Sequence, residues 1–177
     1  MIGYQERTDW MGREVVTLAD VWPQSPRAMI VGLNPAPESV QAGHYYQGRV
    51  GQRQMGRLVA AGVFDRPDGP YFESVALASH TGFTDIVKRS SRGERDVEDA
   101  EIRYGRHLLE ANLNAREIPL VICVFRQPAE ALLEESAAPG LQERRTAWGA
   151  RVFRMPGPFD KREVVTSVMA SLTRALD

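Results

Sequence analysis

The sequence predicts an α/β fold with a mainly parallel sheet between helices. Its short apolar runs are apolar almost throughout rather than alternating with polar residues, which is typical of strands covered on both faces. Segments with helical spacing alternate with these runs along the chain. The chain has 177 residues, of which 43% are hydrophobic and 25% charged, as in an ordinary globular protein. We therefore expect one domain spanning residues 1–177.

The predicted strands are short and end at breaker or charged residues. Three runs are read as buried strands: 27–33 (RAMIVGL), 118–125 (IPLVICVF) and 152–155 (VFRM). A fourth segment, 83–89 (FTDIVKR), mixes apolar and charged residues and is read as a strand end or loop. Residues 1–12 are polar, so we expect them to be loosely held.

Four segments carry apolar residues at helical spacing: 52–61, 97–114, 128–135 and a final helix after position 160. Asp96 precedes the second of these and is a suitable N-cap. Asp160 and Glu163 have the spacing of a capping box that would open the final helix. A connection rich in proline and glycine, 65–72, separates the first helix from the segment that follows.

Composition excludes several classes of protein. No run approaches the roughly 18 apolar residues of a membrane span, and the N-terminus lacks a basic-then-apolar signal, so we expect no membrane association. The single cysteine, Cys123, lies in an apolar run, which fits a reducing, cytoplasmic compartment. A net charge of −1 argues against an unselective coat on nucleic acid. Nothing in the sequence demands more than a monomer.

Two polar side chains follow predicted strands, where ligands of parallel sheets collect. Asn34, in a Gly-Leu-Asn-Pro loop, can donate and accept hydrogen bonds at once and so hold a water or the edge of a base. An ordinary Asn–Pro turn explains it equally well. Asp85 could act as a general base or stabilise a cation. The alternative is a surface aspartate paired with Lys88 or Arg89.

A third loop, 155–158, has a backbone path fixed by two prolines and Gly157. Phe159 follows it, then Lys161 and Arg162. An exposed aromatic beside cations fits nucleic acid, where apolar wedges part stacked bases and cations hold phosphates. Alternatively, Phe159 is a hydrophobic staple of the last helix.

Aromatic residues beside arginines recur in nucleobase pockets, and 43–49 (GHYYQGR), followed by Arg53 and Arg57, has this pattern. Each aromatic taken singly is also explained by ordinary packing. The three histidines are too far apart in sequence for a metal site, and the chain lacks a glycine-rich phosphate loop. We expect neither a metal nor a cofactor.

Taken in order, four segments resemble the uracil-DNA glycosylase superfamily, and most closely its mismatch-specific uracil/thymine branch, from about residue 17 to 175. They are Gly32-Leu33-Asn34-Pro35-Ala36, Gly43-His44-Tyr45-Tyr46, 82–89 (GFTDIVKR) and Met155-Pro156-Gly157-Pro158 with Phe159. The resemblance implies a three-layer α/β/α sandwich. It also implies cofactor-free hydrolysis of the N-glycosidic bond of a uracil, or a related deaminated or mismatched base, flipped out of DNA.

The resemblance further implies roles for individual residues. Asn34 would position the water and Tyr46 would stack on the base, while backbone amides near Leu33 and Gly157 would stabilise the departing anion. Gly32 and Met155 would complete the base pocket. The residues expected to contact DNA are Lys88, Arg89, Pro158, Phe159, Lys161 and Arg162.

The chain departs from the family pattern at several positions. Ala36 replaces a glycine, Met155 supplies no hydrogen bond, and 52–55 (QRQM) stands where N-x-F-W is usual. Asp85 occupies a position that is usually Asn or Lys in this branch. A carboxylate activates water better than an amide does, so our hypothesis is that Asp85 shares or takes over the work of Asn34.

Two other functions are compatible with the same residues. A non-catalytic module could bind uracil-containing or single-stranded DNA without turnover. An α/β enzyme acting on free nucleosides or nucleotides would not depend on Phe159, Lys161 or Arg162.

Overall fold

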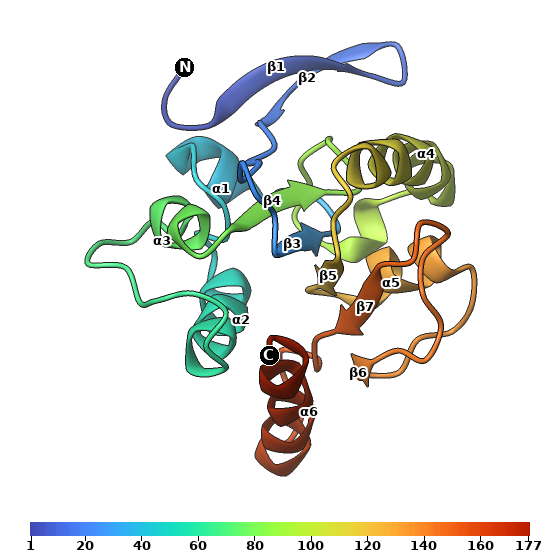
Figure 1. Cartoon of the computed structure of the whole chain (residues 1–177). Coiled ribbons are helices and arrows are strands. Elements are labelled where there is room, and N and C mark those ends of the chain that lie inside the picture. The colour runs from blue at the N-terminus through green and yellow to red at the C-terminus, as the bar shows by residue number, and fades with distance from the viewer.

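The computed structural model describes residues 1–177, which form a central five-stranded sheet and a separate two-stranded one (Figure 1). The central strands lie in the order β4, β3, β5, β7, β6. Their bounds are Ala28–Gly32 for β3, Thr81–Asp85 for β4, Leu120–Cys123 for β5, Gly140–Leu141 for β6 and Arg151–Arg154 for β7. The first four run parallel, and only β6 is antiparallel to its neighbour. The prediction of a mainly parallel sheet is confirmed.

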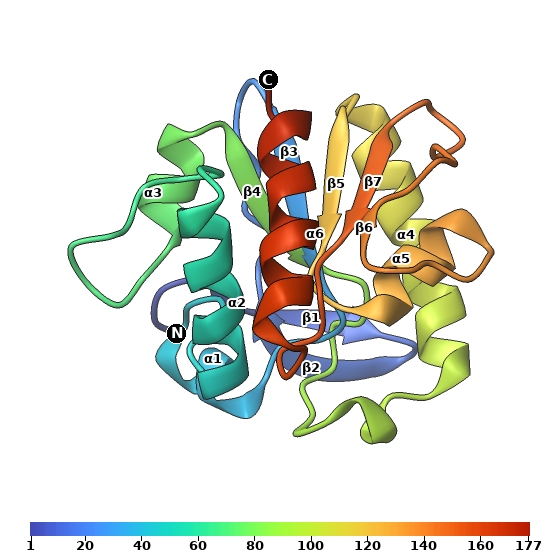
Figure 2. The same ribbon diagram turned by 90° about the horizontal axis from the view of Figure 1, so that it is seen from below.

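Helices cover both faces of the sheet, as the resemblance implied. Alternate residues of β3 point to opposite sides: Ala28 and Ile30 pack with α2, α3 and α6, whereas Met29 and Val31 pack with α4 and α5. Figure 2 looks onto the face covered by α2 and α6. The helices are α1 (Pro37–Ala42), α2 (Arg49–Ala60), α3 (Glu73–Ala78), α4 (Asp99–Ala115), α5 (Arg126–Leu133) and α6 (Arg162–Ala175). None of them is both long and apolar enough to cross a membrane.

The predicted starts of α4 and α6 are wrong. Residues Glu94–Asp96 form a short 3₁₀ turn, and α4 begins later with a capping box between Glu98 and Glu101. At α6 the N-cap is Lys161, without a side-chain hydrogen bond. Asp160 instead accepts a hydrogen bond from the Gly157 amide at 2.7 Å, which closes the loop before the helix.

The N-terminal residues are ordered in a hairpin rather than loosely held. Strand β1 (Gln5–Trp10) pairs antiparallel with β2 (Arg13–Leu18), and the hairpin lies across the top of Figure 1. Trp10 is buried, its indole N–H donates to Glu101 Oε1 at 3.1 Å, and its ring meets that of Tyr104 edge-on. This one aromatic side chain therefore fastens the hairpin to α4.

Candidate active site

The carboxyl ends of β3 and β4 meet at one cavity. Gly32, the last residue of β3, is paired in register with Asp85, the last residue of β4. Asp85 and Asn34, two residues beyond β3, both line a cavity of about 720 Å³. Tyr46 and Phe125 contribute aromatic walls. The two polar side chains singled out in the sequence, 51 positions apart, therefore share one space.

Hydrogen bonds fix the orientation of the Asn34 amide. Its Nδ2 donates to the Arg89 carbonyl oxygen at 2.9 Å and to Ser91 Oγ at 2.7 Å. A carbonyl can only accept, so the nitrogen must face Arg89, and Oδ1 is left as an acceptor. Asn34 does not cap α1, whose N-cap is Ala36. The arrangement favours a ligand-facing oxygen over a simple turn residue.

Asp85 is buried without a cationic partner. Only 5% of it is exposed. The alternative pairing does not occur, because Lys88 binds Asp20 and Arg89 binds Glu101, each at 2.7 Å. Burial raises the pKa of Asp85 to about 7; nearby Lys88 opposes this rise and Asp20 adds to it. Near neutral pH the carboxyl is therefore present in both its acid and its base form.

The hydroxyl of Tyr46 faces the same spot as Asp85. A Cβ built on Gly32 would clash with Asp85 Oδ1 and approach the Tyr46 hydroxyl to 2.9 Å, so both groups lie against this bare backbone. The hydroxyl is buried and has no hydrogen-bond partner. Its pKa is raised well above 10, first by burial and then by Asp85. The wall behind the cavity therefore holds an unpaired hydroxyl beside a carboxyl that has no cationic partner.

The segment that carries Tyr46 is held from several sides. Tyr46 has a positive φ of 57°, an uncommon conformation for a bulky residue. Before it, the buried Glu73 carboxylate accepts from the Tyr45 amide at 2.8 Å and contacts His44 Nδ1 at 3.1 Å. After it, α2 approaches so closely that a Cβ on Gly51 would lie 2.9 Å from the Tyr46 Cα. The aromatic wall is thus rigidly placed.

The 155–159 loop contributes to the cavity differently from what the resemblance implied. Met155 is buried in the core and does not line the cavity. The Gly157 amide, expected to face a departing anion, is already bound to Asp160. Pro158 and Phe159 do line the cavity, and Phe159 is 80% exposed, so it is not a hydrophobic staple for α6.

Of the four predicted DNA-binding cations, two have internal partners. Lys88 and Arg89 are held by Asp20 and Glu101, so their contact with DNA stays a prediction. Lys161 and Arg162 are exposed at the start of α6. No three His, Cys, Asp or Glu side chains are grouped to hold a metal ion.

Sequence reasoning missed one residue of this site and the contacts of two others. Phe125, directly after β5, lines the cavity. Arg53 and Arg57 both reach the 156–158 loop from α2, where Arg57 donates to the Gly157 carbonyl at 2.9 Å. Both arginines were noted beside the aromatic segment, but their contact with this loop was not predicted, because the two segments lie about 100 positions apart in sequence.

A model of a known protein family matches the part of the chain that builds this cavity. The family model described as the uracil DNA glycosylase superfamily matches residues 19–171, which include both strands and every loop that lines the cavity. A comparison with curated proteins gave no match. The chain belongs to the uracil DNA glycosylase superfamily, a group of DNA-binding hydrolases that cleave N-glycosidic bonds in base excision repair.

Proposed function

We propose that the protein removes uracil, or a related deaminated or mismatched base, from DNA by hydrolysing its N-glycosidic bond, leaving an abasic site. The observation that carries the proposal is the convergence of the Asn34 amide, the Asp85 carboxyl and the Tyr46 side chain on one cavity. Its volume of about 720 Å³ is in the usual range for small-molecule sites. A base inside a duplex cannot reach such a cavity, so the nucleotide must be flipped out of the stack.

Asn34 orients the attacking water in this proposal. Its amide nitrogen is committed to Arg89 and Ser91, so only the oxygen remains to accept a hydrogen bond from water. Because both donated bonds fix the side chain, the acceptor is already in position before substrate arrives. The water's oxygen bonds to the sugar carbon while the bond from that carbon to the base nitrogen breaks.

Asp85 assists as a base and as a negative charge. Positive charge grows on the sugar as the bond breaks, and an ionised carboxylate stabilises it. The same carboxylate can accept the proton that the water loses. With a pKa of about 7, a large fraction of Asp85 is ionised at neutral pH and yet basic enough to take a proton.

The departing base carries the electron pair of the broken bond, and therefore negative charge. The rings of Tyr46 and Phe125 supply apolar walls for the base.

The test is base release from a panel of oligonucleotides. The full chain is incubated with otherwise identical duplexes and single strands that carry uracil opposite guanine, thymine opposite guanine, hypoxanthine or ethenocytosine, with an undamaged strand as control. Alkali-labile abasic sites should form with uracil and not with the undamaged strand. Shifted DNA with no abasic product would instead identify a binding module. Release only from free nucleosides would contradict a role in DNA.

A further inference from the structure

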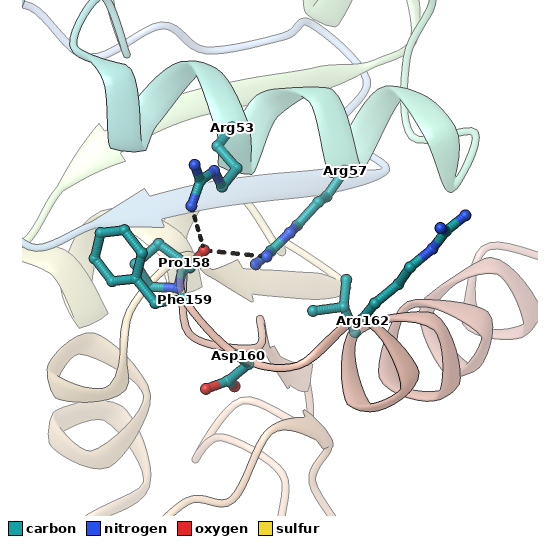
Figure 3. Close-up of a pocket in the computed structure, with 7 residues that line it drawn as sticks. Arg53, Arg57, Pro158, Phe159, Asp160 and Arg162 are labelled. Atoms are coloured by element: carbon teal, nitrogen blue, oxygen red, sulfur yellow. Dashed lines mark hydrogen bonds between the residues drawn. The ribbon is translucent and has the colours of Figure 1, made fainter.

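A second, smaller cleft lies beside the cavity, between α2 and the start of α6. Its volume is about 350 Å³, and Arg53, Arg57 and Arg162 line it. Figure 3 shows Arg53 and Arg57 descending from α2 toward the Pro158 carbonyl, with Arg162 rising from the first turn of α6. Three arginines thus line one open space, and the guanidinium groups of Arg53 and Arg57 meet at its wall.

The positive charge of this cleft is only partly offset within the protein, because one acidic residue faces three arginines. None of the three arginines forms a salt bridge. Arg53 and Arg57 both donate to the neutral Pro158 oxygen, at 3.0 and 3.3 Å. The one acidic residue of the cleft, Asp160, accepts a hydrogen bond from the Gly157 amide.

This arrangement disfavours the charged form of Arg57. Its pKa is lowered by burial and by the charge of Arg53, and Asp160 only partly offsets the effect. An anion bound between the two guanidinium groups that share this carbonyl would reduce the repulsion between them. Guanidinium groups present planar forks of N–H donors that match the oxygens of a phosphate.

We propose that Arg53, Arg57 and Arg162 form a phosphate-binding cleft that holds a backbone phosphodiester of the DNA strand beside the flipped nucleotide. Pro158 and Phe159 line both this cleft and the larger cavity, so the two spaces lie on either side of one short wall. The strand therefore runs over this wall, with its base in one space and a neighbouring phosphate in the other.

The cleft also positions Phe159. The Arg53 guanidinium lies over the Phe159 ring, 5.4 Å from its centroid. A phosphate held by Arg53 therefore sets where this exposed ring stands relative to the strand, which is where a wedge between bases is needed.

This inference rests on the proposed function only in placing the base in the adjacent cavity, and binding measurements test it without turnover. The probes are duplexes that carry a tetrahydrofuran abasic analogue and, one at a time, a neutral methylphosphonate at each linkage around it. The proteins are wild type, Arg53→Gln, Arg162→Gln and the control Arg103→Gln. Arg103 is an exposed arginine on α4, across the sheet from the cleft.

Wild type should lose roughly tenfold in affinity at one or two linkages, as expected for a charged hydrogen bond. Each cleft variant should bind the all-phosphate probe about tenfold more weakly than wild type does. A neutral linkage at the sensitive position should then weaken the variant's binding no further. The variants should also lower the salt dependence of binding by about one phosphate. Arg103→Gln should behave like wild type at the sensitive linkage.

Two results would contradict the proposed phosphate-binding cleft. In the first, the loss of affinity caused by each substitution adds to the loss caused by a neutral linkage at every position. In the second, the wild-type protein does not bind the probes. Base release is scored separately on uracil-containing DNA. If wild type releases no base but Arg53 and Arg162 still couple to one linkage, the proposed function fails and the cleft stands. If base is released without such coupling, the function stands and the cleft fails.

Discussion

The burial of Asp85 lowers the stability of the folded protein whenever its carboxyl is ionised. Asp85 is 5% exposed and has no cationic partner, and burial raises its pKa to about 7. A carboxyl whose pKa rises on folding binds its proton more tightly in the folded state. The free energy of unfolding therefore falls as the pH rises from the pKa of the unfolded carboxyl, near 4, to the folded pKa of about 7. Above pH 7 it falls no further on account of Asp85. Such a cost is expected at a functional position rather than a structural one.

Asp85→Asn should stabilise the protein more at alkaline than at acid pH. The amide is neutral at every pH, so the substitution removes only the charge penalty, which is larger at pH 8 than at pH 5. We expect the gain in free energy of unfolding to be about 2 to 3 kcal/mol greater at pH 8. Urea unfolding of both proteins at the two pH values measures this difference.

The comparison between two pH values makes the test insensitive to how well the amide packs. Asp68→Asn, at an exposed loop position, is the matched control and should show no such difference. Equal effects of Asp85→Asn at pH 5 and pH 8 would contradict a raised pKa.

Single residues could be predicted from the sequence where they lie at or near the carboxyl end of a buried strand. Asn34 and Asp85 were found this way, because parallel strands place their carboxyl ends together. The resemblance assigned Met155 to the base pocket, but its side chain is buried in the hydrophobic core. The hydrogen bond between Asp160 and the Gly157 amide was not predicted, because the same aspartate also fits a helix cap in sequence.

Helix α2 links the two spaces of the site. Its first turn presses against Tyr46 through Gly51, and its middle holds the 156–158 loop. There, buried Gln54 donates to the Pro156 carbonyl at 3.0 Å, and Arg57 binds the next carbonyl along. The helix thus sets the distance between the aromatic wall and the loop that carries Phe159.

Gly51→Ala should displace Tyr46 and impair base release while the fold survives. The new Cβ would lie 2.9 Å from the Tyr46 Cα, and backbone cannot swing aside as a flexible side chain can. A displacement of about 1 Å in a positioning residue can cost on the order of 100-fold in rate. Single-turnover release of uracil measures the effect.

Gly56→Ala, on the same helix, is the control because a Cβ there meets no atom within 4 Å. It should keep its activity and gain up to about 1 kcal/mol in stability from helix propensity. Wild-type rates in Gly51→Ala would show that Tyr46 is not held as described.

Elements were predictable where one signal dominated. Strands β3, β5 and β7 are apolar runs covered on both faces, and their existence was confirmed. The β1–β2 hairpin was missed because its exposed, charged residues look like a loose terminus. Its signal was Met11-Gly12 before the β-branched pair Val15 and Val16, where Met11 and Gly12 both have positive φ, the chemistry of a tight hairpin turn.

The whole molecule gathers its site from distant parts of the chain, and the hairpin helps to hold those parts together. Leu18, at the end of β2, lines the large cavity, and its carbonyl accepts from the buried Tyr45 hydroxyl. Just beyond it, Asp20 binds Thr84 and Lys88, at the end of β4 and in the loop after it. At the other end of the hairpin, Trp10 joins Glu101 of α4.

Trp10→Ala should destabilise the protein by about 3 to 5 kcal/mol. The substitution leaves a large cavity and removes the hydrogen bond to Glu101. Val16→Ala, at a position on β2 that is 42% exposed, is the control and should change stability by no more than about 0.5 kcal/mol. Chemical unfolding compares the two. A small effect of Trp10→Ala would mean that the hairpin is only loosely attached.

The most direct test of the site is the single-turnover rate of uracil release by wild type, Asn34→Ala, Asp85→Asn and the double variant. If both side chains act on one water in one cavity, each single substitution should cost about 100-fold. The double should then cost less than the product of the two, because groups that act together are not additive. Uracil release by Asp85→Asn at the wild-type rate, with the double no slower than Asn34→Ala, would contradict this account.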